Sequence, residues 1–210
     1  MTDEVISILE RIATDVPKRA EELRELDARL GDGDLGFTVT RGLSAMAEAL
    51  PGLRGQPPGD QLARAGMAFN RAASSTFGVL FATALMRGGR ELRGKDNPGA
   101  GDVTAMGRGA LQGMMERGKA HPGDKTLLDA LAPAVDAFEK AHGEGRPLVE
   151  CVDRALEACE QGVKATESMQ SRVSRASWLG ARSVGVQDPG ATAVLYMLRA
   201  AADWVRENET

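Results

Sequence analysis

Apolar side chains recur along this chain every three or four residues, which is the spacing of one face of an α-helix. The first such stripe covers residues 5–12 and continues, after a kink or break at Pro17, as far as Leu26. We find no segment with four clean alternations of apolar and polar residues, which would be typical of a half-buried strand. The pattern therefore predicts an all-α chain.

The same spacing predicts a helix in nearly every later stretch between glycines and prolines, for about eight helices in all. These later helices are expected near residues 37–50, 60–71, 79–85, 103–115, 127–138, 149–163 and 191–205. Helices of similar length joined by short loops favour an antiparallel bundle or a ring of helices. No change of composition flanks the glycine-rich connections Gly52–Gly59 and Arg93–Gly101, so we expect residues 1–210 to form a single domain.

Charge and apolar run length exclude several classes of function. The formal net charge is −4, whereas a dedicated nucleic-acid binder usually carries a basic face, so no nucleic-acid partner is expected. Charged residues interrupt the first twenty positions, and the longest apolar run, 79–86, is too short to span a bilayer. Cys151 and Cys159 would lie about 12 Å apart on one helix, too far for a disulfide. These features predict a cytoplasmic protein without a membrane partner.

Three aspartates stand close together where the first helical region ends, in the segment 26–36. The C-terminus of a helix carries partial negative charge, so it disfavours Asp27, Asp32 and Asp34 unless a cation offsets them. Carboxylate oxygens at short spacing suit Mg²⁺ or Ca²⁺. The segment is not an EF-hand, because Leu43 stands where that loop needs a glutamate. Two interpretations stay open: a metal site, or a solvated turn in which Asp32 or Asp34 caps the next helix.

A run of small and hydroxyl side chains, residues 72–78, precedes the apolar stretch that begins at Val79. At a helix N-terminus the backbone N–H groups can bind an anion, so this segment is a candidate phosphate turn. A simple N-cap for a core helix explains the same residues.

A long loop with several arginines precedes the last predicted helix. Asp188 followed by Pro189 is a strong helix start, and Arg172, Arg175 and Arg182 lie upstream of it. The planar guanidinium group suits phosphate, so the loop is either a ligand loop or a solvated basic segment.

Residues 122–126 (Pro-Gly-Asp-Lys-Thr) superficially resemble a P-loop. The order Gly-Asp-Lys-Thr departs from the Gly-Lys-Thr of that motif, and no strand is predicted before it. We expect Asp124 to cap the helix that follows.

Taken together, the motifs are similar to those of one known family. They are residues 26–36, 118–126 (GKAHPGDKT), 175–183 (RASWLGARS) and 187–192 (QDPGAT). In this order they resemble the nucleotide-binding L subunit of dihydroxyacetone kinase, over essentially the whole chain. The resemblance implies an eight-helix antiparallel barrel with an ATP or ADP site at one end.

The resemblance also implies roles for particular residues. Asp27, Asp32 and Asp34 would hold two Mg²⁺ ions that bridge the phosphates of the nucleotide. Nucleotide contacts would come from Leu35, Gly36, Phe37, Thr38, Thr76, Phe77, Gly118, Leu127, Arg175, Asp188, Pro189 and Gly190. No residue of this chain is expected to act as a nucleophile, and both histidines, His121 and His142, are predicted to be solvated in loops.

In such a system the keto-sugar is held by a separate K subunit, and bound ADP can be recharged by a phosphocarrier protein in place of exchange with ATP. A kinase subunit that works with such partners is therefore the first hypothesis, and a homodimer is left open. The chain departs from the family pattern at Leu35, usually His, at residues 74–78, usually Gly-Gly-Ala-Ser-Gly, and at Ala181 and Val186, commonly Glu and His. These departures support the alternative of a nucleotide-binding regulatory protein that has lost catalysis.

Overall fold

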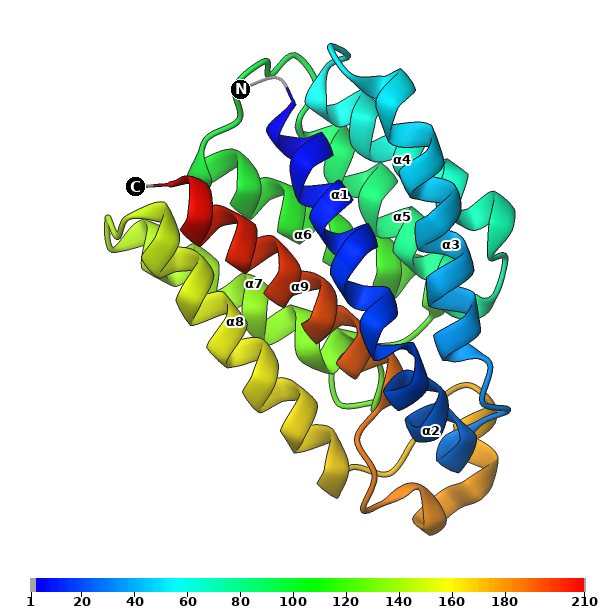
Figure 1. Cartoon of the computed structure of the whole chain (residues 1–210). Helices are drawn as coiled ribbons and strands as arrows, with labels where there is room; N and C mark the ends of the chain where they lie inside the picture. Colours follow the sequence, from blue (N-terminus) through cyan, green and yellow to red (C-terminus); the bar gives the residue numbers. More distant parts are fainter. Residues whose placement is uncertain (1–2, 210) are drawn as a thin grey trace.

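The computed structural model describes residues 3–209, and this range contains helices and loops without a strand (Figure 1). The α-helices are α1 (Glu4–Asp15), α2 (Ala20–Leu30), α3 (Leu35–Ala49), α4 (Pro58–Ala72), α5 (Thr76–Glu91), α6 (Ala100–Gly118), α7 (Leu128–Gly143), α8 (Leu148–Ala165) and α9 (Pro189–Asn208). Short 3₁₀ helices, η1 (Val16–Arg19), η2 (Leu50–Leu53), η3 (Thr166–Ser168) and η4 (Arg175–Ser183), lie in the connections. The prediction of an all-α chain is confirmed.

The helices form a closed ring. From α3 to α9 each helix packs against the next one in the chain, and α1 and α2 both contact α3 on one side and α9 on the other. Helices α1 and α2 follow one another as a single rod that changes from α to 3₁₀ geometry around Pro17 (Figure 1), because proline cannot donate the backbone hydrogen bond that an α-helix needs there. The described residues thus hold nine α-helices in eight ring positions, which confirms the predicted eight-helix architecture.

Apolar side chains from the successive helices fill the centre of the ring. Leu43, Met46 and Phe69 have no exposed surface, and the rings of Phe69 and Phe81 meet edge to face with their centroids 4.8 Å apart. An apolar cavity of about 280 Å³ remains inside the ring. Within residues 3–209, we find no helix with both the length and the apolar character that a membrane crossing requires.

Alternation of helix direction places every second connection at the same end of the ring. The α2–α3, α4–α5, α6–α7 and α8–α9 connections lie at the lower end in Figure 1, and the start of α1 and the end of α9 lie at the upper end. All of the segments that the sequence singled out for chemistry belong to these lower connections or to the helix ends beside them. His142 was predicted to lie in a loop. It is exposed as expected, but it lies in the last turn of α7.

Candidate functional site

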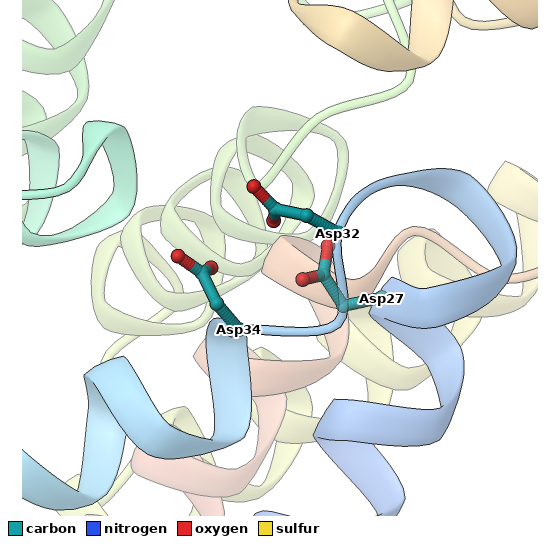
Figure 2. Close-up of side chains that lie close together, drawn as sticks. All are labelled: Asp27, Asp32 and Asp34. Atoms are coloured by element: carbon teal, nitrogen blue, oxygen red, sulfur yellow. The ribbon is translucent and has the colours of Figure 1, made fainter.

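The three aspartates converge at the lower end of the ring (Figure 2). Asp27 lies in the last turn of α2, Asp32 in the connecting loop and Asp34 at the N-cap position of α3. Each offers a carboxylate oxygen, and these oxygens all lie within 4.8 Å of one another. Asp27 is partly buried, whereas Asp32 and Asp34 are exposed. The structure therefore brings together the carboxylates that sequence spacing had grouped.

Glycines make this short connection sharp enough to hold the carboxylates together. Gly31 ends α2 and donates a hydrogen bond from its N–H to the carbonyl of Asp27, at 2.6 Å. Gly33 has a φ of +75°, a backbone conformation that favours glycine. The chain thus reverses within a few residues and places Asp34 opposite Asp27.

The N-terminus of α3 is capped by Asp27 and not by its own N-cap residue. The Asp27 carboxylate accepts a hydrogen bond from the Leu35 N–H at 3.2 Å, and the Asp34 side chain makes no cap hydrogen bond. The interpretation in which Asp32 or Asp34 merely caps the next helix is therefore wrong. Asp27 is held by the start of α3, which leaves the other two carboxylates directed toward the common space.

One cation from a distant part of the chain reaches this cluster. Arg175, at the start of η4, donates from its guanidinium to the Asp32 carboxylate in an ion pair. Within residues 3–209, Arg175 is the cation that forms an ion pair with these aspartates, so most of the charge of the three carboxylates is without compensation. Three hard carboxylate oxygens within reach of one centre are the donor set that Mg²⁺ prefers, so the residues present fit this metal.

The α4–α5 connection forms a capped helix start. The Ser75 hydroxyl accepts a hydrogen bond from the Gly78 N–H at 3.1 Å, so the N-cap interpretation is confirmed. Phe77 is 8 % exposed, and its ring stacks on Phe81 with a centroid separation of 6.2 Å. The Phe77 ring therefore points into the core. Thr76 is exposed, and the role of this turn in anion binding stays a prediction.

The first turn of α3 alternates between core and surface. The Leu35 side chain is 6 % exposed and belongs to the hydrophobic core, Thr38 is a buried polar residue, and Phe37 is 68 % exposed. Gly36 lies against α2: a Cβ built there would stand 2.0 Å from the carbonyl oxygen of Ala20. This close approach fixes the start of α3 beside the rod that carries Asp27.

The ends of α6, α7 and α9 contribute the remaining predicted residues. Gly118 is the last residue of α6 and faces Leu80 of α5. Leu127 is the N-cap residue of α7 and is buried, and Gly190 of α9 lies against it. The structure thus brings Leu127 next to the Asp188–Gly190 turn, although they are far apart in the sequence.

The predicted helix start at Asp188 is confirmed. Its carboxylate accepts a hydrogen bond from the Ala191 N–H at 2.7 Å, and Pro189 is the first residue of α9. The Thr166 hydroxyl accepts a hydrogen bond from the Asp188 N–H at 2.9 Å. Burial raises the pKa of Asp188 to about 7, and the nearby positive charge of Lys125 works against this shift.

The α6–α7 connection differs from its prediction. Asp124 does not cap α7; it accepts a hydrogen bond from the His121 N–H at 2.8 Å within its own turn. Asp129, which is 6 % exposed, instead accepts from the Thr126 N–H at 2.7 Å at the start of α7. An acidic residue in the first turn of a helix favours its N-terminus, so Asp129 was the available sequence signal for this role. Neither this role of Asp129 nor the burial of Lys125 was predicted from the sequence.

Comparison with known proteins identifies the family to which this chain belongs. Residues 29–203 match the DAK2 domain. The chain belongs to the DAK2 domain family. The match confirms the resemblance inferred from the sequence motifs, and it includes Asp32 and Asp34 but starts just after Asp27.

Two relatives illustrate the range of proteins that contain this domain. The chain is 32 % identical over 196 residues to the ADP-binding subunit DhaL of the PEP-dependent dihydroxyacetone kinase of Escherichia coli K12, with 93 % of each chain covered. It is 34 % identical over 187 residues to the D-erythrulose kinase of Mycolicibacterium smegmatis, which covers 88 % of this chain and 32 % of that enzyme. This DAK2 domain chain therefore matches DhaL over nearly its full length and the longer kinase over about a third.

Solved structures agree with the sequence comparison. The native dihydroxyacetone kinase of C. freundii superimposes with a TM-score of 0.73 at 25 % identity, covering 95 % of this chain and 34 % of that one. The same kinase in complex with AMP-PNP and Mg²⁺ gives a TM-score of 0.71 at 26 % identity, covering 95 % of this chain and 33 % of the other. The relatives and solved structures named here are thus kinases or kinase subunits.

Proposed function

We propose that this chain is the Mg²⁺- and nucleotide-binding subunit of a cytoplasmic phosphotransferase similar to dihydroxyacetone kinase. The observation that carries the proposal is the group of three carboxylates within 4.8 Å of one another at one end of the ring. The DhaL relative is an ADP-binding subunit, and the C. freundii kinase has been crystallised with AMP-PNP and Mg²⁺. Both support a nucleotide as the ligand at this end.

In this proposal the aspartates hold two Mg²⁺ ions, which supply charge neutralisation to the polyphosphate. The Leu35 N–H fixes the Asp27 carboxylate, and Arg175 moves from Asp32 to a phosphate oxygen, where its planar fork of donors is well suited. The remaining nucleotide contacts are proposed to come from Gly36, Phe37, Thr38, Thr76, Phe77, Gly118, Leu127, Asp188, Pro189 and Gly190. For Phe77 and Leu35 only the backbone can take part, because both side chains lie in the core.

The acceptor of the phosphoryl group is proposed to be a small keto-sugar held by a partner K subunit. Phosphoryl transfer depends on positioning and charge neutralisation more than on covalent chemistry, so a subunit without a nucleophile can still serve it. The donor is either ATP or ADP that stays bound and is recharged by a phosphocarrier protein. Transfer would then take place where the aspartate end of the ring meets the partner.

The test is calorimetric titration with Mg·ADP and Mg·ATP. Asp32→Asn and Asp34→Asn should each weaken binding by tenfold or more, on the order of the loss of one metal ligand. Asp60→Asn is the matched control, because Asp60 is an exposed aspartate in the first turn of α4 at the opposite end of the ring. Equal binding by the Asp32 variant and the control would remove the proposed site.

The alternative function, a regulatory nucleotide-binding protein without catalysis, was motivated by Leu35 and Phe77. Since both side chains point into the core, neither obstructs the carboxylates, and the kinase subunit is the function that we favour. Transfer assays with the cognate K subunit separate the two. Tight Mg·ADP binding without transfer to any keto-sugar would support the regulatory protein.

A further inference from the structure

Lys125 is a motif residue whose chemistry the proposed site does not use. It is 2 % exposed, although lysine side chains are rarely buried. Its ammonium group donates hydrogen bonds to the carbonyls of Met169 at 3.1 Å, Ser183 at 2.6 Å and Val186 at 2.7 Å. An ammonium has three N–H donors, and all three acceptors belong to the connection between α8 and α9.

These acceptors lie on both sides of the loop that carries Arg175. Met169 precedes η4, Ser183 is the last residue of η4, and Val186 follows it. Two further hydrogen bonds bring the same flanks together: the Ser171 N–H donates to the Ser183 hydroxyl at 2.9 Å, and the Gly185 N–H donates to the Glu167 carbonyl at 2.7 Å. Lys125 therefore stands at the base of a closed loop.

The Lys125 ammonium is unsuited to the phosphate role that the sequence Gly-Asp-Lys-Thr suggests. A P-loop lysine must present free donors to the ligand, whereas these donors are used by backbone carbonyls and the side chain is shielded from solvent. Burying a charge is expensive unless hydrogen bonds compensate it, and burial lowers the pKa of this ammonium. A charged group whose three donors are all used by backbone carbonyls, with Asp188 and Glu167 as nearby acidic groups, indicates a structural task.

We propose that Lys125 is a positioning residue that fastens the 169–186 loop so that Arg175 reaches the aspartate cluster. Few residues link Lys125 to the aspartate cluster. The Arg172 N–H donates to the carbonyl of Asp124, the neighbour of Lys125, at 3.1 Å, and Arg175 forms the ion pair with Asp32 three residues further along the loop. The α6–α7 connection thus sets the position of the arginine that the α8–α9 loop supplies. The nucleotide part of this inference rests on the proposed function, whereas the fastening of the loop does not.

Trypsin tests the fastening directly, because Arg172, Arg175 and Arg182 lie in the loop and are exposed. In Lys125→Met the three carbonyls lose their donors, and cleavage after these arginines should become about tenfold faster. Lys119→Met is the matched control, since Lys119 is exposed and shares the left-handed backbone conformation of Lys125, with φ of 53° and 61°. Equal cleavage of both variants and the unaltered chain, read by mass spectrometry, overturns the proposal.

A comparison of Arg175→Ala in two backgrounds tests whether Lys125 positions Arg175. Arg175→Ala should weaken Mg·ADP binding by about tenfold in the unaltered chain but by less than about twofold in the Lys125→Met background, where the arginine is no longer held in place. Equal losses in the two backgrounds overturn the positioning role. Lys125→Arg keeps cationic donors and should restore part of the slow cleavage and of the affinity. If the methionine variant does not fold, Lys125→Gln, which replaces the ammonium by an amide, takes its place in both measurements. If the unaltered chain binds neither Mg·ADP nor Mg·ATP, the proposed function fails, and the trypsin result still decides whether Lys125 holds the loop.

Discussion

Arg175 and Asp32 are 143 positions apart in the sequence and form an ion pair at the mouth of the helical ring. The pair joins the α8–α9 loop to the α2–α3 connection, which also contact each other through η4 and α2. A divalent cation and the guanidinium would compete for the same carboxylate. Under the proposed function, we therefore expect Arg175 to oppose the binding of bare metal and to favour a metal that arrives with a polyphosphate.

Arg175→Ala should for this reason have opposite effects on two ligands. Binding of Mn²⁺ alone, measured by electron paramagnetic resonance, is expected to tighten by about two- to fivefold, the scale of an exposed ion pair. Binding of Mg·ADP is expected to weaken by about tenfold, because a charge-assisted hydrogen bond to phosphate is lost. Arg182→Ala, in the same loop, is the control. A parallel change for both ligands would show that the two cations do not compete.

Asp27 has two tasks that substitutions can separate. Asp27→Asn keeps an oxygen acceptor for the Leu35 N–H but loses the charge, so metal affinity should fall while the helix cap is retained. Asp27→Ala loses both, and its free energy of unfolding should lie about 1 kcal/mol below that of the asparagine variant. Urea denaturation measures the difference. Identical stability of the two variants would mean that the Leu35 hydrogen bond does not support α3.

Gly78 is required at the start of α5. A Cβ built on it would stand 1.8 Å from the carbonyl oxygen of Ala73, so the turn would have to move. Gly78→Ala is expected to lower the free energy of unfolding by about 1–3 kcal/mol, the usual range for overpacking, and to weaken Mg·ADP binding through the displaced Thr76–Phe77 turn. Gly52→Ala is the control, because a Cβ there meets nothing within 4 Å. Thermal unfolding that leaves the two variants equal would contradict this packing.

Phe77 should behave as a core residue. Phe77→Ser removes a buried ring that stacks on Phe81, and the expected loss is about 3 kcal/mol in the free energy of unfolding. No gain in nucleotide affinity should accompany it. Thr76→Ser, at the exposed neighbouring position, should leave stability nearly unchanged. Tighter Mg·ADP binding by a stable Phe77→Ser protein would show instead that the ring obstructs the site.

The stability of the chain should depend on pH through Asp188. Since its pKa is raised to about 7, the folded chain keeps a proton on this carboxyl between about pH 4 and pH 7, where the unfolded chain has lost it. The free energy of unfolding contributed by Asp188 should therefore fall as the pH rises through this window. Asp188→Asn keeps an acceptor for the Ala191 N–H and should lack this part of the dependence. Thermal unfolding at several pH values gives both curves, and parallel curves would exclude a raised pKa.

The helices and the aspartate cluster could be predicted because both depend on short sequence distances, whereas the closed ring was implied by the family resemblance. Helical periodicity is a local signal, and Asp27, Asp32 and Asp34 are close together in the chain before it folds. The break at Pro17 was equally visible, although the pattern could not show whether one helix or two would result. Local spacing therefore accounts for the elements and for the core of the site.

Long-range packing accounts for what the sequence did not show. The pairing of Arg175 with Asp32 and the burial of Lys125 both require the α8–α9 loop to fold onto the α2–α3 and α6–α7 connections, and no local pattern encodes that arrangement. Phe77 stacks on Phe81 of the same helix, and the Phe81 ring packs edge to face on Phe69 of α4, so the inward direction of Phe77 depends on packing between helices. Asp124 and Asp129 are both near the start of α7, and composition alone could not decide which carboxylate would accept the backbone hydrogen bonds.

An even number of ring positions has a practical consequence for any assay on a solid support. The polypeptide enters and leaves the ring at the upper end: near its beginning, the Asp3 carboxylate accepts a hydrogen bond from the Gly55 N–H, and α9 finishes on the same side (Figure 1). A tag fused to either terminus would therefore anchor the molecule with the end of the ring that carries the three aspartates facing the bulk solution. Biosensor measurements of nucleotide and partner binding can use either orientation of attachment without shielding the surface being probed.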